Sequence, residues 1–171
     1  NCRVINENGI YKNVDGLITQ NPNLILSLSV ADCCPIFIFD RNSNIRGLIH
    51  SGWRGTVDKI ILNAINRFKE LGSKIQNLCI FIGPSIGGCC YEVGKDVSDF
   101  FQNDCKNKNK NNKIFIDIKK QIQLDLLKIG IKKTQIQMSK ICTLENKECE
   151  SYRRDGDQSG RMIALFGDFT R

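Results

Sequence analysis

Two short apolar runs separated by four polar residues constrain the fold of this chain more than any other feature. The runs are Pro35–Asp40 (Pro-Ile-Phe-Ile-Phe-Asp) and Ile45–His50 (Ile-Arg-Gly-Leu-Ile-His), and residues 41–44 between them are Arg-Asn-Ser-Asn. Apolar runs of this length around an Asn/Ser turn are typical of adjacent β-strands. Residues 24–30, which alternate apolar and small polar side chains from Leu26 onward, add a third strand. The three runs predict a β-meander with buried faces.

The hydrophobic period changes from two to about 3.6 after this region. Apolar residues recur at helical spacing from Val57 to Leu71, and Gly72 follows as a stop signal. Later segments repeat both patterns. The predicted strands are 78–82, 114–116, 135–138 and 162–166, and the predicted helices are 97–101 and 118–129. The mixture of meander and crossovers predicts an α+β fold with mixed β-sheets flanked by helices in three layers. We expect one domain over residues 1–171.

Composition narrows the class of protein. The chain has 41% apolar and 25% charged residues, as a globular domain does, and it has no apolar run of about 18 residues, so no membrane span is expected. The first residues carry neither an initiator methionine nor a signal-peptide pattern, and we expect a chain that lacks an N-terminal segment. The nine cysteines include no Cys-x-x-Cys pair, so we expect no structural zinc knuckle. Several of them lie inside apolar strand-like runs, which predicts reduced thiols and a cytoplasmic protein.

The net charge of +7 is not arranged as a nucleic-acid binding surface. Four lysines fall in Lys106–Lys113, a run of only Lys and Asn without aromatic residues. Such a run is typical of a solvated surface insertion. We therefore expect no nucleic-acid partner, although a positive field of this size attracts small anionic substrates such as phosphate.

Cys33 and His50 have the clearest chemical potential. His50 is the only histidine and ends one predicted strand, and Cys33 precedes the other. A thiol and an imidazole at the ends of neighbouring strands are typical of a thiolate nucleophile or a zinc site. Pro35 predicts a strand break or a sheet edge, and strand alternation directs Cys34 away from Cys33. We interpret Asp32 as an acceptor that holds a turn.

Arg54 is the third candidate. His50 is followed by Ser-Gly-Trp-Arg-Gly and then by the amphipathic helix, so the turn leads into a helix N-terminus with free N–H groups. A planar guanidinium on such a turn suits phosphate or carboxylate. We predict Cys33, His50 and Arg54 as the catalytic set, and we predict no residues dedicated to an organic cofactor.

Several segments with these residues form a recognisable series. In chain order they are Asp15-Gly16-Leu17-Ile18-Thr19, Ala31-Asp32-Cys33, His50-Ser51-Gly52-Trp53-Arg54-Gly55, Ile82-Gly83-Pro84-Ser85-Ile86, Cys90-Tyr91-Glu92-Val93, Cys142-Thr143, Ser151-Tyr152-Arg153-Arg154-Asp155-Gly156 and Gly160-Arg161. With them the chain resembles the bacterial purine nucleoside phosphorylases formerly described as multicopper polyphenol oxidases, or laccase-domain proteins. The resemblance spans nearly the whole chain, and Ser51 replaces the alanine usual in the family.

The resemblance implies a zinc ion bound by one cysteine and two histidines. Cys33 matches the thiolate and His50 one imidazole, and the second histidine is expected upstream of Asn1. A catalytic zinc usually keeps three protein ligands. With only Cys33 and His50 in place, we expect this chain to bind zinc weakly or not at all and to have little activity. Cys89, Cys90 or Glu92 could be recruited, but no spacing supports it.

For the intact protein the resemblance implies phosphorolysis of adenosine, inosine, guanosine and methylthioadenosine, and hydrolytic deamination of adenosine. Its partners would be purine nucleosides and phosphate. Arg154 is a second candidate cation for the phosphate, weighed against a surface salt bridge. The Gly83-Pro84 turn either shapes the nucleoside pocket or is structural.

Three alternatives remain open from the sequence. A cysteine hydrolase or deamidase would use Cys33 as nucleophile and His50 as base, without a metal. A copper polyphenol oxidase is the weaker alternative because its sites need many histidines and this chain has one. A non-enzymatic interaction module would bury both side chains in its core.

Overall fold

The computed structural model describes residues 1–108 and 111–168, and its centre is a mixed β-sheet. Six strands hydrogen-bond in the order β1-β2-β5-β4-β6-β10. The pairs β1–β2 and β6–β10 are parallel, and the other pairs are antiparallel. The bounds are β1 Cys2–Val4, β2 Gly16–Thr19, β4 Cys34–Asp40, β5 Arg46–Ser51, β6 Leu78–Ile82 and β10 Ile136–Met138.

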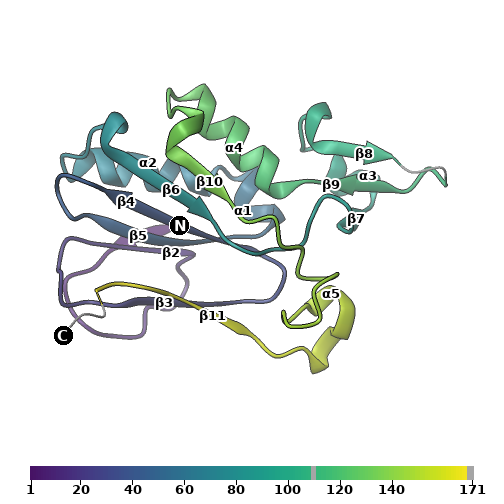
Figure 1. Ribbon diagram of the computed structural model, residues 1–171, viewed down its shortest axis with the longest axis horizontal. Coiled ribbons are helices and arrows are strands. Elements are labelled where there is room, and N and C mark those ends of the chain that lie inside the picture. Colours follow the sequence, from purple (N-terminus) through teal and green to yellow (C-terminus); the bar gives the residue numbers. More distant parts are fainter. Residues whose placement is uncertain (109–110, 169–171) are drawn as a thin grey trace.

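Helices cover one face of this sheet and a two-stranded sheet lies on the other (Figure 1). The helices are α1 (Trp53–Val57), α2 (Ile60–Glu70) and α4 (Ile118–Lys128), and the second sheet pairs β3 (Leu26–Val30) with β11 (Met162–Phe166). The expected α+β fold with mixed sheets in layers is confirmed.

A smaller third sheet extends the molecule beside α4. It consists of β7 (Glu92–Val93), β9 (Ile114–Ile116) and β8 (Lys106–Lys108), and α3 (Lys95–Ser98) packs on it. Part of the expected lysine-rich insertion is therefore a paired strand, and residues 109–110 of it lie outside the described part of the chain. The remaining short elements are α5 (Tyr152–Asp155) and 3₁₀ turns at Ile75–Asn77, Asn103–Cys105, Lys133–Gln135 and Gly156–Gln158.

The main core lies between the central sheet and the helices. Ile36 and Ile38 of β4 and Ile49 of β5 are fully buried there. Phe68 of α2 packs directly on β5, because a Cβ at Gly47 would come within 2.8 Å of its ring. Only glycine allows this close approach between a helix side chain and a strand backbone.

The helix predicted from Val57 to Leu71 begins at Ile60, as α2, and Val57 is the last residue of the separate helix α1. Lys59 has a left-handed backbone (φ 58°) and separates α1 from α2. Its ammonium binds the buried carboxylate of Asp125 in α4 at 2.9 Å. The break therefore carries an ion pair between helices. Gly72, at φ 92°, follows α2 as predicted.

The predicted meander is wrong for its first strand. β4 and β5 form the expected hairpin, but β3 pairs with β11 in the other layer, with Leu28 opposite Ala164. The change of layer occurs at Asp32, whose left-handed backbone (φ 77°) redirects the chain. The predicted alternation within β3 is correct, because Leu26 and Val30 are buried and Ser27 and Ser29 are exposed.

The sheet edge predicted at Pro35 is also wrong, because β4 lies between β5 and β6. The proline is tolerated because it is the second residue of β4 and pairing with β6 begins only at Ile36. Its missing N–H therefore interrupts no ladder hydrogen bond on that side. Strands β1, β2, β7 and β8 have no counterpart among the predicted elements.

Replacing Phe68 by alanine tests this packing. Because the ring is fully buried against β5, we expect Phe68→Ala to lower the free energy of unfolding by about 3–5 kcal/mol, measured by urea denaturation. Phe100→Ala is the matched control, because that ring is 62% exposed, and it should change stability by less than about 0.5 kcal/mol. Equal effects would contradict the assigned core.

Candidate active site

Cys33 and His50 lie at the same end of the β4–β5 hairpin. Pro35 pairs with His50 and Cys34 with Ser51. The Cys33 sulfur lies against Gly52, where a Cβ would come within 2.9 Å of it. Gly52 thus leaves room for the thiol beside the start of α1. Cys34 is fully buried in the main core, in agreement with the opposite direction predicted for it.

The two side chains line different cavities of the described chain. His50 lines one of about 320 Å³ together with Asp15, Ser27 and Ser29. Cys33 lines a smaller one of about 120 Å³. Within residues 1–108 and 111–168, no third Cys, His, Asp or Glu completes a ligand group around them. The hairpin thus brings Cys33 and His50 to the same end, but the two side chains line separate cavities.

The surroundings of the pair favour neutral side chains. Burial, and then the charge of Asp32, raise the pKa of the Cys33 thiol, against a smaller opposing effect of Arg161. Burial lowers the pKa of His50, opposed by Asp15. A neutral imidazole is a metal ligand, whereas a protonated thiol becomes a nucleophile or ligand only when a cation or a base takes its proton.

Asp32 holds the turn before Cys33, as expected. Its carboxylate accepts the Thr143 hydroxyl at 2.5 Å and the N–H of Arg153 at 2.7 Å, and its carbonyl accepts the N–H of Ile86 at 2.9 Å. Three distant segments therefore converge on one residue. Because both carboxylate oxygens are occupied and the side chain is buried, Asp32 has a structural role rather than that of a free base.

One arginine, Arg153, lines the cavity of Cys33. Arg153 lines it with Tyr91, stacks over the Tyr91 ring at 5.0 Å and donates to the Glu92 carbonyl at 2.7 Å. Burial and Cys33 raise the pKa of Tyr91, while Arg153 and Arg54 oppose the rise. Arg54, which stacks on Trp53 at 4.5 Å, is thus within electrostatic reach of the same phenol.

Arg153, not Arg154, is the arginine of the Tyr-Arg-Arg-Asp segment that reaches this cavity. The Arg154 guanidinium pairs with Asp155 and donates to the carbonyls of Thr143 and Cys149 at 3.2 and 2.8 Å. Arg154 thus holds the loop of residues 143–149, in agreement with the salt-bridge interpretation weighed for it from the sequence. Sequence reasoning missed Arg153 and Tyr91, although both lie in motifs that it singled out. The Gly83 N–H donates to the Pro35 carbonyl at 2.8 Å, which gives the Gly83-Pro84 turn a structural role.

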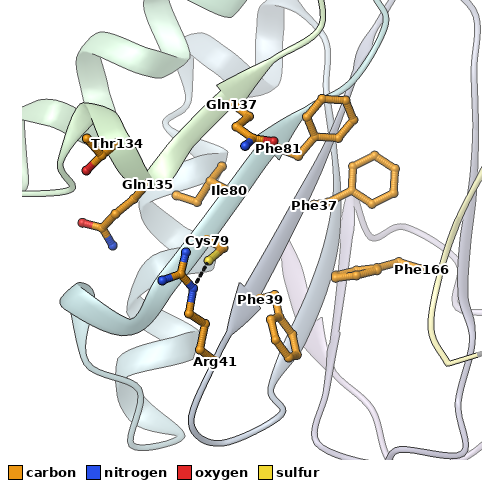
Figure 2. A pocket seen from close by; sticks show the side chains of 10 residues that line it. All are labelled: Phe37, Phe39, Arg41, Cys79, Ile80, Phe81, Thr134, Gln135, Gln137 and Phe166. Atoms are coloured by element: carbon orange, nitrogen blue, oxygen red, sulfur yellow. Dashed lines mark hydrogen bonds between the residues drawn. The ribbon is translucent and has the colours of Figure 1, made fainter.

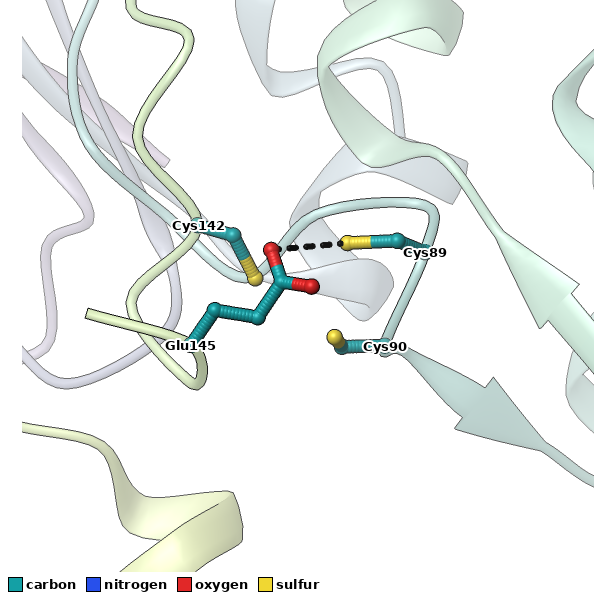
Figure 3. Close-up of side chains that lie close together, drawn as sticks. All are labelled: Cys89, Cys90, Cys142 and Glu145. Carbon is teal, nitrogen blue, oxygen red and sulfur yellow. Dashed lines mark hydrogen bonds between the residues drawn. The ribbon is translucent and has the colours of Figure 1, made fainter.

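Cys89 and Cys90 join a different group. Together with Cys142 and Glu145 they form a cluster in which all ligand atoms lie within 4.8 Å of one another (Figure 3). Burial raises the pKa of Cys142, but the N–H groups of Gly87, Glu145 and Leu144 outweigh it, so that its pKa is lowered. No Cys-x-x-Cys spacing reveals this cluster, because its members come from loops more than fifty residues apart in sequence.

A cavity larger than those at His50 and Cys33 lies elsewhere, along β4 and β6 (Figure 2). It measures about 440 Å³ and is lined by Phe37, Phe81 and Phe166 among others. Arg41 beside it donates to the Cys79 sulfur. It extends toward the end of β4 opposite to Cys33, and its lining has no pair of nucleophile and base. We therefore place the candidate site at Cys33.

Asp32→Ala tests the role of the turn. The substitution removes two hydrogen bonds to a carboxylate and leaves alanine with a positive φ, so we expect the free energy of unfolding to fall by about 2–4 kcal/mol in urea denaturation at pH 7. Asp32→Asn should cost less, because asparagine tolerates the left-handed region and keeps one acceptor oxygen. An alanine variant as stable as the asparagine variant would contradict this role.

The raised pKa of Cys33 predicts a pH dependence of alkylation in metal-free protein. Below its pKa the group is a thiol, so iodoacetamide should react more slowly at pH 7 than with N-acetylcysteine, and the rate should still rise above pH 9. Mass spectrometry of the Cys33 peptide measures the rate. A rate that levels off below pH 8 would mean a lowered pKa and would contradict the prediction.

Comparison with known proteins identifies the family of this chain. The family model of the multi-copper polyphenol oxidoreductase laccases matches residues 1–167. A purine nucleoside phosphorylase of Bacteroides thetaiotaomicron is 34% identical over 160 residues, with 88% of this chain and 59% of the relative covered. One of Borreliella burgdorferi is 37% identical over 151 residues, covering 84% and 65%.

The fold comparison gives the same result. The crystal structure of YlmD from Geobacillus stearothermophilus superposes with a TM-score of 0.85 at 31% identity and covers 91% of this chain and 61% of that one. The chain thus spans about three fifths of the length of the relatives that it matches. With this match over nearly its whole length, the chain belongs to the multi-copper polyphenol oxidoreductase laccase family.

Proposed function

We propose that the protein to which this chain belongs is a zinc-dependent purine nucleoside phosphorylase that also deaminates adenosine. The observation that carries the proposal is the cavity lined by Cys33, Tyr91 and Arg153 at the end of the β4–β5 hairpin that also bears His50. Arg54 follows this hairpin in α1, and its charge acts on Tyr91. The names of the relatives from Bacteroides and Borreliella support the phosphorylase activity. The deaminase activity rests on the resemblance alone. No helix in the described chain is long and apolar enough to cross a membrane.

The donors at this end of the hairpin fit zinc in kind. Cys33 offers a sulfur and His50 a neutral imidazole, and both are usual zinc ligands. Two donors are one fewer than a catalytic zinc site needs, and we expect a histidine from the part of the family's length that this chain does not span. Zinc bound there would supply Lewis-acid activation of a water molecule for deamination. Copper fits less well, because the chain has a single histidine.

Phosphorolysis needs an anion held against the anomeric carbon of the nucleoside. An oxygen of phosphate bonds to this carbon while the bond to the purine nitrogen breaks, and the purine leaves with a proton. In our proposal Arg54 and Arg153 bind the phosphate, because guanidinium groups match its oxygens. Tyr91, whose pKa is raised, stays protonated at neutral pH and can donate a hydrogen bond to the substrate.

The cysteine-hydrolase alternative has less support. A Cys–His dyad works through a thiolate and an imidazolium, which requires a lowered cysteine pKa. Burial acts in the opposite direction on both groups, since it raises the pKa of Cys33 and lowers that of His50. A non-enzymatic interaction module would bury Cys33 and His50 in its core. Both side chains line cavities instead.

The activity is tested on the full-length protein with adenosine and phosphate, by chromatography of adenine and inosine. We expect release of both products and their loss in Cys33→Ser and His50→Ala. Arg54→Ala should raise the KM for phosphate about 10- to 100-fold, the equivalent of one charge-assisted hydrogen bond of about 1.5–3 kcal/mol.

Arg41→Ala is the matched control, because Arg41 lines the distant cavity on β4 and β6, and its KM for phosphate should be unchanged. Absence of both products from the wild-type protein would overturn the proposed function. An equal effect of the two arginine substitutions would remove Arg54 from the phosphate site.

A further inference from the structure

The loops that follow β6 and β10 bring three cysteines and one glutamate together (Figure 3). The sulfur atoms of Cys89, Cys90 and Cys142 and a carboxylate oxygen of Glu145 all lie within 4.8 Å of one another. Among the described residues this is the one group of three or more Cys, His, Asp or Glu side chains that could hold a metal ion. The proposed reaction uses none of these residues.

We propose that Cys89, Cys90, Cys142 and Glu145 bind one zinc ion in a structural site separate from the site at Cys33 and His50. Three sulfurs and one oxygen are a complete donor set for a tetrahedral ion, and a site in which all four positions come from the protein is closed to water and substrate. The inference goes beyond the proposed function, since it assigns no step of the reaction to this metal.

The distances suit such a site. With zinc–sulfur bonds of about 2.3 Å, tetrahedral geometry places ligand atoms about 3.7 Å apart. The cluster atoms are already within 4.8 Å of one another, and the Cys89 sulfur and the Glu145 carboxylate are 3.5 Å apart. A contraction of about 1 Å closes the site, and side-chain rotations at the exposed Cys89 and Glu145 can supply it.

The backbone around Cys142 prepares it as a ligand. Its sulfur accepts the N–H of Gly87 at 3.2 Å, and hydrogen bonds of this kind orient and stabilise metal-bound ligands. A Cβ at Gly87 would come within 2.9 Å of the Cys89 sulfur and 3.3 Å of the Cys142 sulfur. Glycine at this position therefore lets both sulfurs approach the same loop.

The two loops are fixed to each other beside the cluster. Ser85 and Cys142 form a parallel β-bridge, and the Thr143 N–H donates to the Ser85 carbonyl at 3.2 Å. The neighbouring residues Ile86 and Thr143 both hydrogen-bond to Asp32. A zinc ion in the cluster would thus clamp the two loops that hold the turn before Cys33.

Cobalt(II) is the probe that tests the site, because thiolate ligation gives a charge-transfer absorption and tetrahedral geometry gives characteristic visible bands. The metal-free, reduced full-length protein is titrated with cobalt and then with zinc. The background is the Cys33→Ser/His50→Ala double variant, which removes the other proposed site. We expect one equivalent of cobalt with thiolate absorption and its displacement by zinc, even if the protein shows no phosphorylase activity.

Single substitutions in this background locate the metal. Cys142→Ser should weaken zinc binding at least about 100-fold, more than the 10- to 100-fold typical of a lost outer partner. Cys149→Ser, in the same loop but outside the cluster, is the matched control and should bind as the parent does. Cys89→Ser provides a second variant at an exposed position if Cys142→Ser fails to fold. Zinc should also raise the Tm of the parent and not that of Cys89→Ser.

Failure to take up one equivalent of cobalt would overturn the proposal. So would binding that survives both Cys142→Ser and Cys89→Ser, because the metal would then lie elsewhere. A disulfide among Cys89, Cys90 and Cys142 that persists in reductant and blocks uptake would assign the cluster to thiol chemistry instead. From Cys33 and His50 the sequence predicts weak or no zinc binding by this chain, and one tightly bound zinc per chain in the cluster would contradict that prediction.

Discussion

The antiparallel register between β4 and β5 is the constraint on which the site depends. Ile36 pairs with Ile49 and Pro35 with His50, so alternate residues of both strands enter the helix-facing core while the others face β3 and β11. A shift by one residue would exchange the two faces. It would move His50 into the apolar core and Ile49 out of it. The burial of the isoleucines against α2 therefore fixes the direction of the imidazole.

Asp32 holds the loops that lie beside this end of the hairpin. Its left-handed backbone separates β3 from β4, and its polar groups bind Ile86, Thr143 and Arg153. A buried carboxylate is stable only when its oxygens are hydrogen-bonded. The hydrogen bonds of Asp32 thus hold three segments, from three parts of the sequence, around the thiol of Cys33.

Seven of the nine cysteines fall into three environments with different physical roles. Cys2, Cys34 and Cys105 lie in the core, where burial raises their thiol pKa values to about 11, 12 and 11. They pack as small apolar side chains. Cys33 lies beside a cavity lined with arginine and tyrosine. Cys89, Cys90 and Cys142 meet a carboxylate in the third environment, and only there do several sulfurs converge.

The sequence by itself determined most of the longer elements and three of the candidate residues. Hydrophobic period located the β4–β5 hairpin, α2, β6, α4 and β11, because one buried face imposes a regular spacing on apolar residues. The sequence also singled out Cys33, His50 and Arg54, because a thiol, an imidazole and a guanidinium lie at or beside predicted strand ends. Strands β1 and β2 were not predicted, because three or four residues are too few to show a hydrophobic period.

Only the tertiary structure decided which segments meet. The layer of β3 depended on one left-handed residue, the choice between Arg153 and Arg154 depended on the direction of a four-residue helix, and the group of Cys89, Cys142 and Glu145 depended on two loops joined by a single β-bridge. Local sequence carries no periodic signal for contacts between such loops. They form because the central sheet places the ends of β6 and β10 side by side, and burial of that sheet sets the position of everything attached to it.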